Sequence, residues 1–126
     1  MEVEEQIAYW LGGSQEDIEA AGVLIEQRKI RQGLFFAHLA VEKVLKASVT
    51  KATAAIPPRT HDLLRLADLA GVALPPERRE FLARLQRYCL EGRYPDLPSA
   101  VPTWEESKAE LTEAQETRSW LASQLT

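Results

Sequence analysis

Apolar residues recur at helical spacing along almost the whole chain, and this periodicity constrains the fold more than any other feature of the sequence. A first stripe runs from about residue 3 to 28 and contains Ile7, Trp10, Leu11, Ile18, Ala21, Leu24 and Ile25. A second stripe runs to about residue 52 and contains Leu34, Ala37, Val41, Val44 and Leu45. Apolar residues three and four positions apart share one face of a helix, and the alternation typical of strands is absent. The sequence therefore predicts an all-α protein.

The second predicted helix differs from the others in being apolar on nearly every side over residues 34–41, LFFAHLAV. A helix of this kind is buried within its own bundle or shared with a partner. The first predicted helix is interrupted by Gly12-Gly13-Ser14, which either kinks it or restarts it with Ser14 as N-cap. We expect the second helix to be the central one.

Three further helices follow the break at Ile56-Pro57-Pro58. Thr60 is the predicted N-cap of a short third helix that stops at Gly71. Pro75-Pro76 opens a fourth helix that ends near Gly92. Thr103 and Glu106 form the capping box of the fifth helix. Short connections predict a four- or five-helix up-and-down bundle with antiparallel neighbours.

Length and composition limit the class of protein. A chain of 126 residues fits one domain, residues 1–126, with a single core. It has no run of about 18 apolar residues that could span a membrane, and its acidic start, MEVEEQIAYW, is unlike a secretory signal, so we expect a cytoplasmic protein. Cys89 is the single cysteine, so no disulfide within the chain is expected. With only two histidines beside it, the sequence also predicts no metal site, and no cofactor is expected. The absence of asparagine and the preference for arginine over lysine suggest a thermophilic source.

Charge is segregated along the chain despite a net value of only −4. Residues 1–28 carry seven acids and one base, and residues 95–126 carry six acids and two bases. The segment between them, residues 29–94, has a net charge of +6. This basic middle either faces a polyanion such as RNA or pairs with the acidic outer helices of the same chain.

Three stretches resemble the HEPN family of small helical-bundle proteins. They are AHLAVEKVLKA at residues 37–47, THDLLRLADLAG at residues 60–71 and YCLEGRYPD at residues 88–96. The spacing of Trp10 and Asp17 in the first predicted helix fits as well. The resemblance covers nearly the whole chain and keeps the order of the elements.

The resemblance implies a bundle that forms a homodimer and works beside a separate minimal nucleotidyltransferase, as in a toxin–antitoxin pair. Many HEPN proteins are metal-independent RNA endonucleases. In those, an arginine followed four to six residues later by a histidine lies near the dimer cleft. The histidine would assist attack of the RNA 2′-hydroxyl on the adjacent phosphate, and the arginine would stabilise the developing charge.

This chain departs from the nuclease pattern. The arginine at the corresponding place is Arg93, and no histidine follows it between residues 94 and 100. An earlier pair, Arg31 and His38, has six residues between its members. Seven helical steps separate those two side chains by about 10.5 Å along the axis, so we interpret their spacing as accidental.

The two histidines each admit a structural and a functional interpretation. His38, Glu42 and Lys46 are one turn apart, so they form either a polar seam inside the bundle or its dimer interface, or a row that orients an imidazole for proton transfer. His61 sits beside Asp62 at a predicted helix N-terminus, where it either decorates the cap or helps to hold an anion.

The end of the fourth predicted helix carries the exposed candidates for ligand binding. Arg93 offers a fork for phosphate and Tyr94 a ring for base stacking; alternatively, Arg93 caps its own helix while Tyr94 packs on the bundle. The residues predicted to contact a nucleotide or RNA are Arg93, Tyr94, Asp96, His61, Lys43 and Lys46.

Three functions follow from these patterns. The first is a nucleotide- or RNA-associated HEPN-type interaction protein that pairs with a minimal nucleotidyltransferase. The second is an endoribonuclease that uses His38 or His61 as base, with Arg93 supplied across the dimer. The third is a purely structural helical adaptor.

Overall fold

In the described part of the chain, four helices pack around one central helix. The computed structural model describes residues 2–93 and 101–125, except for the side chains of residues 90–93. The helices are α1 (Val3–Glu26), α2 (Ile30–Thr53), α3 (Leu63–Ala70), α4 (Pro76–Arg93) and α5 (Trp104–Ser123). No strand occurs within the described ranges, which confirms the all-α prediction.

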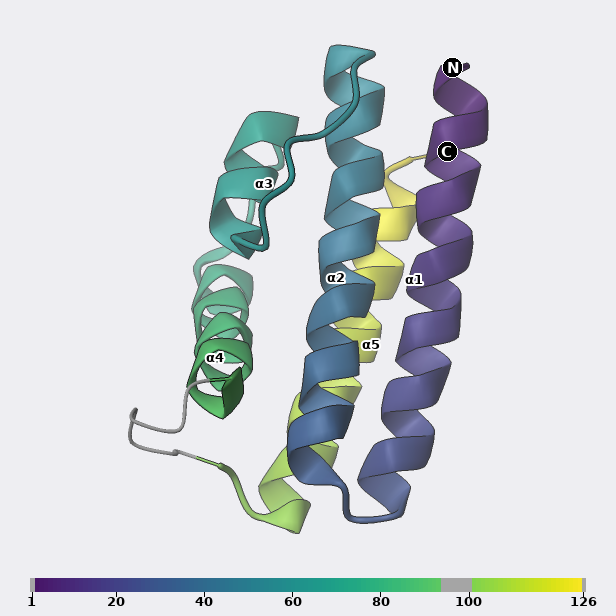
Figure 1. Cartoon of the computed structure of the whole chain (residues 1–126). Helices are drawn as coiled ribbons and strands as arrows, with labels where there is room; N and C mark the ends of the chain where they lie inside the picture. The colour runs from purple at the N-terminus through teal and green to yellow at the C-terminus, as the bar shows by residue number, and fades with distance from the viewer. Residues whose placement is uncertain (1, 94–100, 126) are drawn as a thin grey trace.

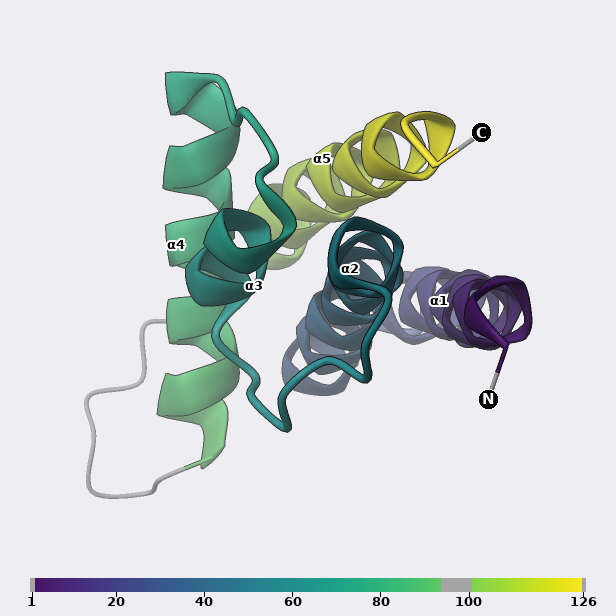
Figure 2. The ribbon, with the colours of Figure 1, turned by 90° about the horizontal axis from the view of Figure 1, so that it is seen from above.

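Helix α2 is the centre of the bundle, as its apolar sequence predicts. It contacts each of the other four helices. Figures 1 and 2 show α1 on one side of α2, α3 and α4 on the opposite side, and α5 along a third side. Its fully buried side chains point in several directions and include Ala37, Ala40, Val41, Val44 and Leu45. The core is therefore built around α2 within a single chain.

Helix α1 is continuous, so of the two alternatives at Gly12-Gly13-Ser14, the restart with Ser14 as N-cap is wrong. The Ser14 hydroxyl instead donates to the Ala40 carbonyl at 2.6 Å and accepts from Arg118 Nε at 2.8 Å. The side chain thus joins α1 to α2 and α5. Burial lowers the pKa of Arg118, whose guanidinium lies in this interface.

The helix ends follow the sequence signals with one correction. The N-cap of α3 is Asp62 rather than Thr60: the Asp62 carboxylate accepts from the Arg65 N–H at 3.2 Å. Both residue types cap helices well. The Thr60 hydroxyl acts in the turn before the helix, where it accepts from the Asp62 N–H at 3.2 Å. Gly71 ends α3 in the left-handed conformation, as predicted.

The predicted capping box at the start of α5 is confirmed. Thr103 Oγ1 accepts from the Glu106 N–H at 3.1 Å, and Glu106 Oε1 accepts from the Thr103 N–H at 2.9 Å. The next residue, Trp104, donates its indole N–H to the Ile25 carbonyl at 2.6 Å. The Arg28 guanidinium and the Lys108 ammonium each lie 3.9 Å from the Trp104 ring centroid. The start of α5 is thereby held against the turn between α1 and α2.

Acidic outer helices pair with the basic middle of the chain, as the intramolecular interpretation of the charge pattern requires. Lys43 Nζ of α2 lies 2.7 Å from Asp17 Oδ2 of α1. Arg84 of α4 lies 3.1 Å from Glu110 and 3.0 Å from Glu113 of α5. A side-chain hydrogen bond to Glu110 raises the pKa of Arg84. Part of the basic charge is therefore neutralised within the chain.

Candidate functional site

A buried carboxylate, Glu42, lies at the centre of a polar cluster between α2 and the segment before α3. The residue is only 3% exposed and lies on α2. Its Oε2 is 3.0 Å from Lys46 Nζ, and its Oε1 is 2.8 Å from His61 Nδ1 and 3.7 Å from His38 Nδ1. A buried charge needs such partners, because removal from water is otherwise costly. Glu42 therefore joins α2 to the segment before α3.

His38 and Lys46 form the buried part of this cluster. They are 1% and 8% exposed and lie one helical turn before and after Glu42. The Lys46 ammonium also lies 5.3 Å from the Trp10 ring centroid on α1, so the ring covers it from that side. These contacts agree with the prediction of a polar seam, and they place the seam inside one chain.

His61 is the exposed part of the cluster, since 62% of its side chain is open to solvent. The segment that carries it begins where Ala54 ends α2 in the left-handed conformation, and it ends at the Asp62 cap of α3. His61 therefore precedes the α3 cap, and it reaches back to α2 rather than decorating the cap.

The hydrogen bond to Glu42 also orients the imidazole. When the Glu42 carboxylate is ionised it can only accept hydrogen bonds, and Nδ1 of His61 then carries the hydrogen in this contact. In the neutral ring, Nε2 is then the proton acceptor. A neutral imidazole held in this way can take a proton from a ligand, and a protonated one can attract a phosphate.

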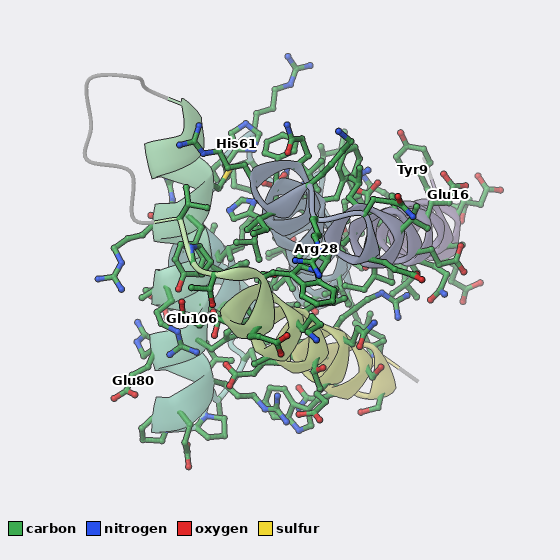
Figure 3. All side chains as sticks on the ribbon, turned by 90° about the horizontal axis from the view of Figure 1, so that it is seen from below. Tyr9, Glu16, Arg28, His61, Glu80 and Glu106 are labelled. Atoms are coloured by element: carbon green, nitrogen blue, oxygen red, sulfur yellow. The ribbon has the colours of Figure 1, made fainter. Side chains whose placement is uncertain are left out.

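The same side of the bundle contains the C-terminal half of α4. The Leu63 N–H donates to Gln86 Oε1 at 2.7 Å, which fixes the start of α3 against α4. Arg93 is the last residue of α4, seven residues after Gln86, or about 10 Å along the axis. Figure 3 shows His61 beside this half of α4. The side chain of Arg93, and all of Tyr94 and Asp96, lie outside the described residues.

The α4 face toward α5 is occupied by packing. Arg84 pairs with Glu110 and Glu113, and burial raises the pKa of the Tyr88 phenol, with a further contribution from Glu110. This face of α4 is therefore committed to its contacts with α5.

Of the other predicted residues in the described part of the chain, Lys46 shares the Glu42 carboxylate with His61, whereas Lys43 does not reach it. Lys43 pairs with Asp17 toward α1, and Lys46 is committed to Glu42. Arg31 is exposed in the first turn of α2, whereas His38 is buried, so this pair offers no shared surface. The contact that sequence reasoning missed is Glu42 with His61: the two residues are 19 positions apart, and no periodic pattern links them.

The described part of the chain contains neither a group of candidate metal ligands nor a candidate membrane-spanning helix. Within residues 2–93 and 101–125, no three histidine, cysteine or acidic side chains are grouped closely enough to ligate a metal ion. No helix in those ranges has both the length and the apolar character needed to cross a bilayer.

Comparison with known proteins agrees with this architecture. Residues 7–124 match the HEPN domain family. TT1696 from Thermus thermophilus is similar in crystal structure, with a TM-score of 0.77 and 25% identity over 92% of this chain and 95% of that chain. ST0689, an archaeal HEPN homologue, has a TM-score of 0.72 and 19% identity over 100% of this chain and 99% of that chain. No curated protein matches the chain significantly. With nearly its whole length matched and its five helices in the same fold, this chain belongs to the HEPN domain family.

Proposed function

We propose that this HEPN protein associates with RNA or a nucleotide through phosphate contacts at His61 and at the C-terminal end of α4. The observation that carries the proposal is the exposed His61 held at 2.8 Å by the buried Glu42. A ring fixed in this way loses little conformational freedom when a ligand binds. Arg59 and Arg65 flank His61 in the sequence and are exposed, which adds positive charge to this side.

Binding of a fluorescent single-stranded RNA, followed by anisotropy at several salt concentrations, tests this proposal. His61→Ala and Arg93→Ala should each weaken binding. Arg93→Ala should also reduce the salt dependence, because each lost phosphate contact lowers the slope of log K against log salt concentration by about 0.7. Arg79→Ala is the matched control: it removes the same charge from an exposed position 14 residues earlier on α4. Equal losses in Arg79→Ala and Arg93→Ala would show that binding follows overall charge and would contradict the site.

The Glu42–His61 contact also favours a second function, that of a metal-independent endoribonuclease. Here His61 Nε2 accepts the proton of an RNA 2′-hydroxyl, whose oxygen attacks the adjacent phosphate. The bond to the 5′ oxygen of the next nucleotide breaks, and that oxygen gains a proton, leaving a 2′,3′-cyclic phosphate and a 5′-hydroxyl. Arg93, supplied across a dimer, would stabilise the charge on the phosphate.

Incubation of RNA with the protein in EDTA separates the two functions. Cleavage to 2′,3′-cyclic phosphate ends, lost in His61→Ala and in Arg93→Ala, supports the nuclease. Intact RNA at high protein concentration, with binding retained, supports association alone. If the protein neither binds nor cleaves RNA, the result favours the helical adaptor.

Homodimer formation and a minimal nucleotidyltransferase partner are further parts of the proposal, and they are supported by membership of the family. Light scattering after size exclusion measures the dimer mass. A tagged pull-down from the native host, with mass spectrometry, tests the partner. A stoichiometric nucleotidyltransferase supports the two-protein system, whereas recovery of this chain alone contradicts it.

A further inference from the structure

One side of α2 is not covered by any helix of the described chain. Figures 1 and 2 show α1 and the α3–α4 pair on opposite sides of α2 and α5 behind it, while the remaining side is turned toward the viewer in Figure 1. The α2–α3 connection, residues 54–62, borders this side through the contact of His61 with Glu42. Helix α1 borders it through the contact of the Trp10 ring with Lys46. The uncovered side of α2 is therefore a strip between α1 and the α2–α3 connection.

The N-terminal half of this strip is apolar. Phe35 and Leu39 lie seven and three residues before Glu42, so they share its face of α2, and both are only half-buried. On the α1 border, Tyr9 is 72% exposed, and its ring contacts Trp10 edge-on with centroids 5.4 Å apart. An apolar surface of this kind, on a helix that is otherwise packed, is typical of a contact with another protein.

The two borders of the strip carry opposite charges. Helix α1 belongs to the segment 1–28, whose net charge is −6, and its Glu16 is exposed. The α2–α3 connection carries Arg59 and His61, which are also exposed. No ion pair within the described residues involves Glu16 or Arg59. Figure 3 shows Glu16 and His61 on opposite flanks of α2.

These opposite charges lie at a similar height along the bundle. Asp17 of α1 pairs with Lys43 of α2 at 2.7 Å. Their sequence neighbours, Glu16 and Glu42, therefore differ in height by about one helical turn at most. Because Glu42 holds His61 at 2.8 Å, the basic connection and the acidic Glu16 flank the same level of the strip.

We propose that the strip is the interface with a second copy of this chain, and that a two-fold axis parallel to α2 relates the two copies. The inference rests on the proposed homodimer and adds its face and its symmetry. A two-fold interface places the same surface of both copies together. Rotation about an axis parallel to α2 keeps every residue at its height and exchanges the two borders. The acidic α1 of one copy then faces the basic connection of its partner, and symmetry repeats this contact.

Charge selects this axis over the other one that the strip allows. A two-fold axis at a right angle to α2, within the same face, would place α1 of one copy against α1 of its partner. Each of those segments has a net charge of −6, so they would repel each other. With the axis parallel to α2, Glu16 of one copy faces the partner's Arg59 instead, and Phe35 and Leu39 of both copies lie near the axis.

Charge reversal of the full chain tests the interface, with the dimer Kd measured by sedimentation velocity at several protein concentrations. Glu16→Arg and Arg59→Glu should each raise the Kd about tenfold or more, because each introduces two like-charge contacts per dimer. The double variant that carries both changes in one chain should return the Kd to near the wild-type value, since the charges are again opposite. Glu80→Arg is the matched control: Figure 3 shows Glu80 at the end of α4 away from His61, so the Kd should not change.

Cross-linking with a short bismaleimide tests the direction of the axis. In a Cys89→Ala background, which removes the single native cysteine, Glu16→Cys and Arg59→Cys are prepared as separate proteins. An axis parallel to α2 predicts cross-links between the two variants when they are mixed, and none within Glu16→Cys alone. An axis at a right angle to α2 predicts the reverse.

The contradicting results are distinct for the homodimer and for this interface. A protein that stays monomeric at about 100 μM, far above the Kd of a stable dimer, would contradict both. A dimer whose Kd is unchanged by Glu16→Arg and Arg59→Glu would keep the homodimer and reject this face. Weaker dimers in both single variants without recovery in the double variant would reject the charge pairing, and therefore the axis.

Discussion

Glu42 is the residue on which the polar cluster depends, because it neutralises Lys46 and orients His61. Glu42→Leu leaves the ammonium of Lys46, which is 8% exposed, without its carboxylate. We expect the free energy of unfolding to fall by about 3–5 kcal/mol, as is typical when one partner of a buried ion pair is removed. Urea denaturation measures the loss.

The double variant Glu42→Leu with Lys46→Met is the control for this interpretation. Both charges are then absent, so the protein should be more stable than Glu42→Leu alone. A double variant that is less stable than the single one would show that the two side chains are not coupled.

Two helical glycines should respond to alanine in opposite directions. A Cβ at Gly33 would lie 2.5 Å from Ile25 Cδ1 and 3.2 Å from the Ile25 backbone nitrogen, and Ile25 is only 2% exposed. Gly33→Ala should therefore destabilise the protein by about 1–3 kcal/mol through overpacking of α1 against α2. Gly22→Ala meets no atom within 4 Å and should stabilise it by about 0.5–1 kcal/mol. Thermal unfolding of both variants measures these two changes. A Gly33→Ala variant more stable than wild type would contradict the prediction and would mean that α1 and α2 separate easily.

At the scale of single elements, the stability that the capping box contributes at the start of α5 should depend on pH. Hydrogen bonds from the Thr103 backbone N–H and then from the Thr103 side chain lower the pKa of Glu106. A carboxylate with a lowered pKa in the folded state stabilises the fold above its unfolded pKa, and this contribution is lost as the pH falls through the folded pKa. The Tm difference between wild type and Glu106→Ala should thus be positive at pH 7 and shrink toward pH 3.

Glu105→Ala is the control for the capping prediction. Glu105 lies in the same turn and is exposed, and it pairs with Lys108 rather than with the cap. Its variant should show a smaller change in Tm between the two pH values. An equal change in both variants would assign the effect to the helix dipole rather than to the capping box.

The helices themselves could be predicted from the sequence, because the signals for them are local. The capping box of Thr103 and Glu106 and the left-handed stop at Gly71 depend on residues within one turn. The choice between Thr60 and Asp62 as cap could not be made in this way. Both are good caps, and in the folded chain Asp62 accepts from the Arg65 N–H while Thr60 accepts from the Asp62 N–H.

At the scale of the whole molecule, the central position of α2 was predictable from residues 34–41, but the candidate site was only partly so. The i and i+4 spacing identified His38, Glu42 and Lys46 as neighbours. The addition of His61 required the packing of α3 against α2 and α4, which no local pattern encodes. Arg93, Tyr94 and Asp96 stay predictions, since their side chains lie outside the described residues.

The measurement that most directly tests the phosphate site is photochemical cross-linking of the full chain to a single-stranded RNA that contains 4-thiouridine. Mass spectrometry of the peptides then locates the contact. The proposed function predicts cross-links within residues 59–65 and 88–96. It also predicts that these cross-links are lost in the double variant that combines His61→Ala and Arg93→Ala. Cross-links that are confined to α1 or α5, or that persist in the double variant, would contradict it.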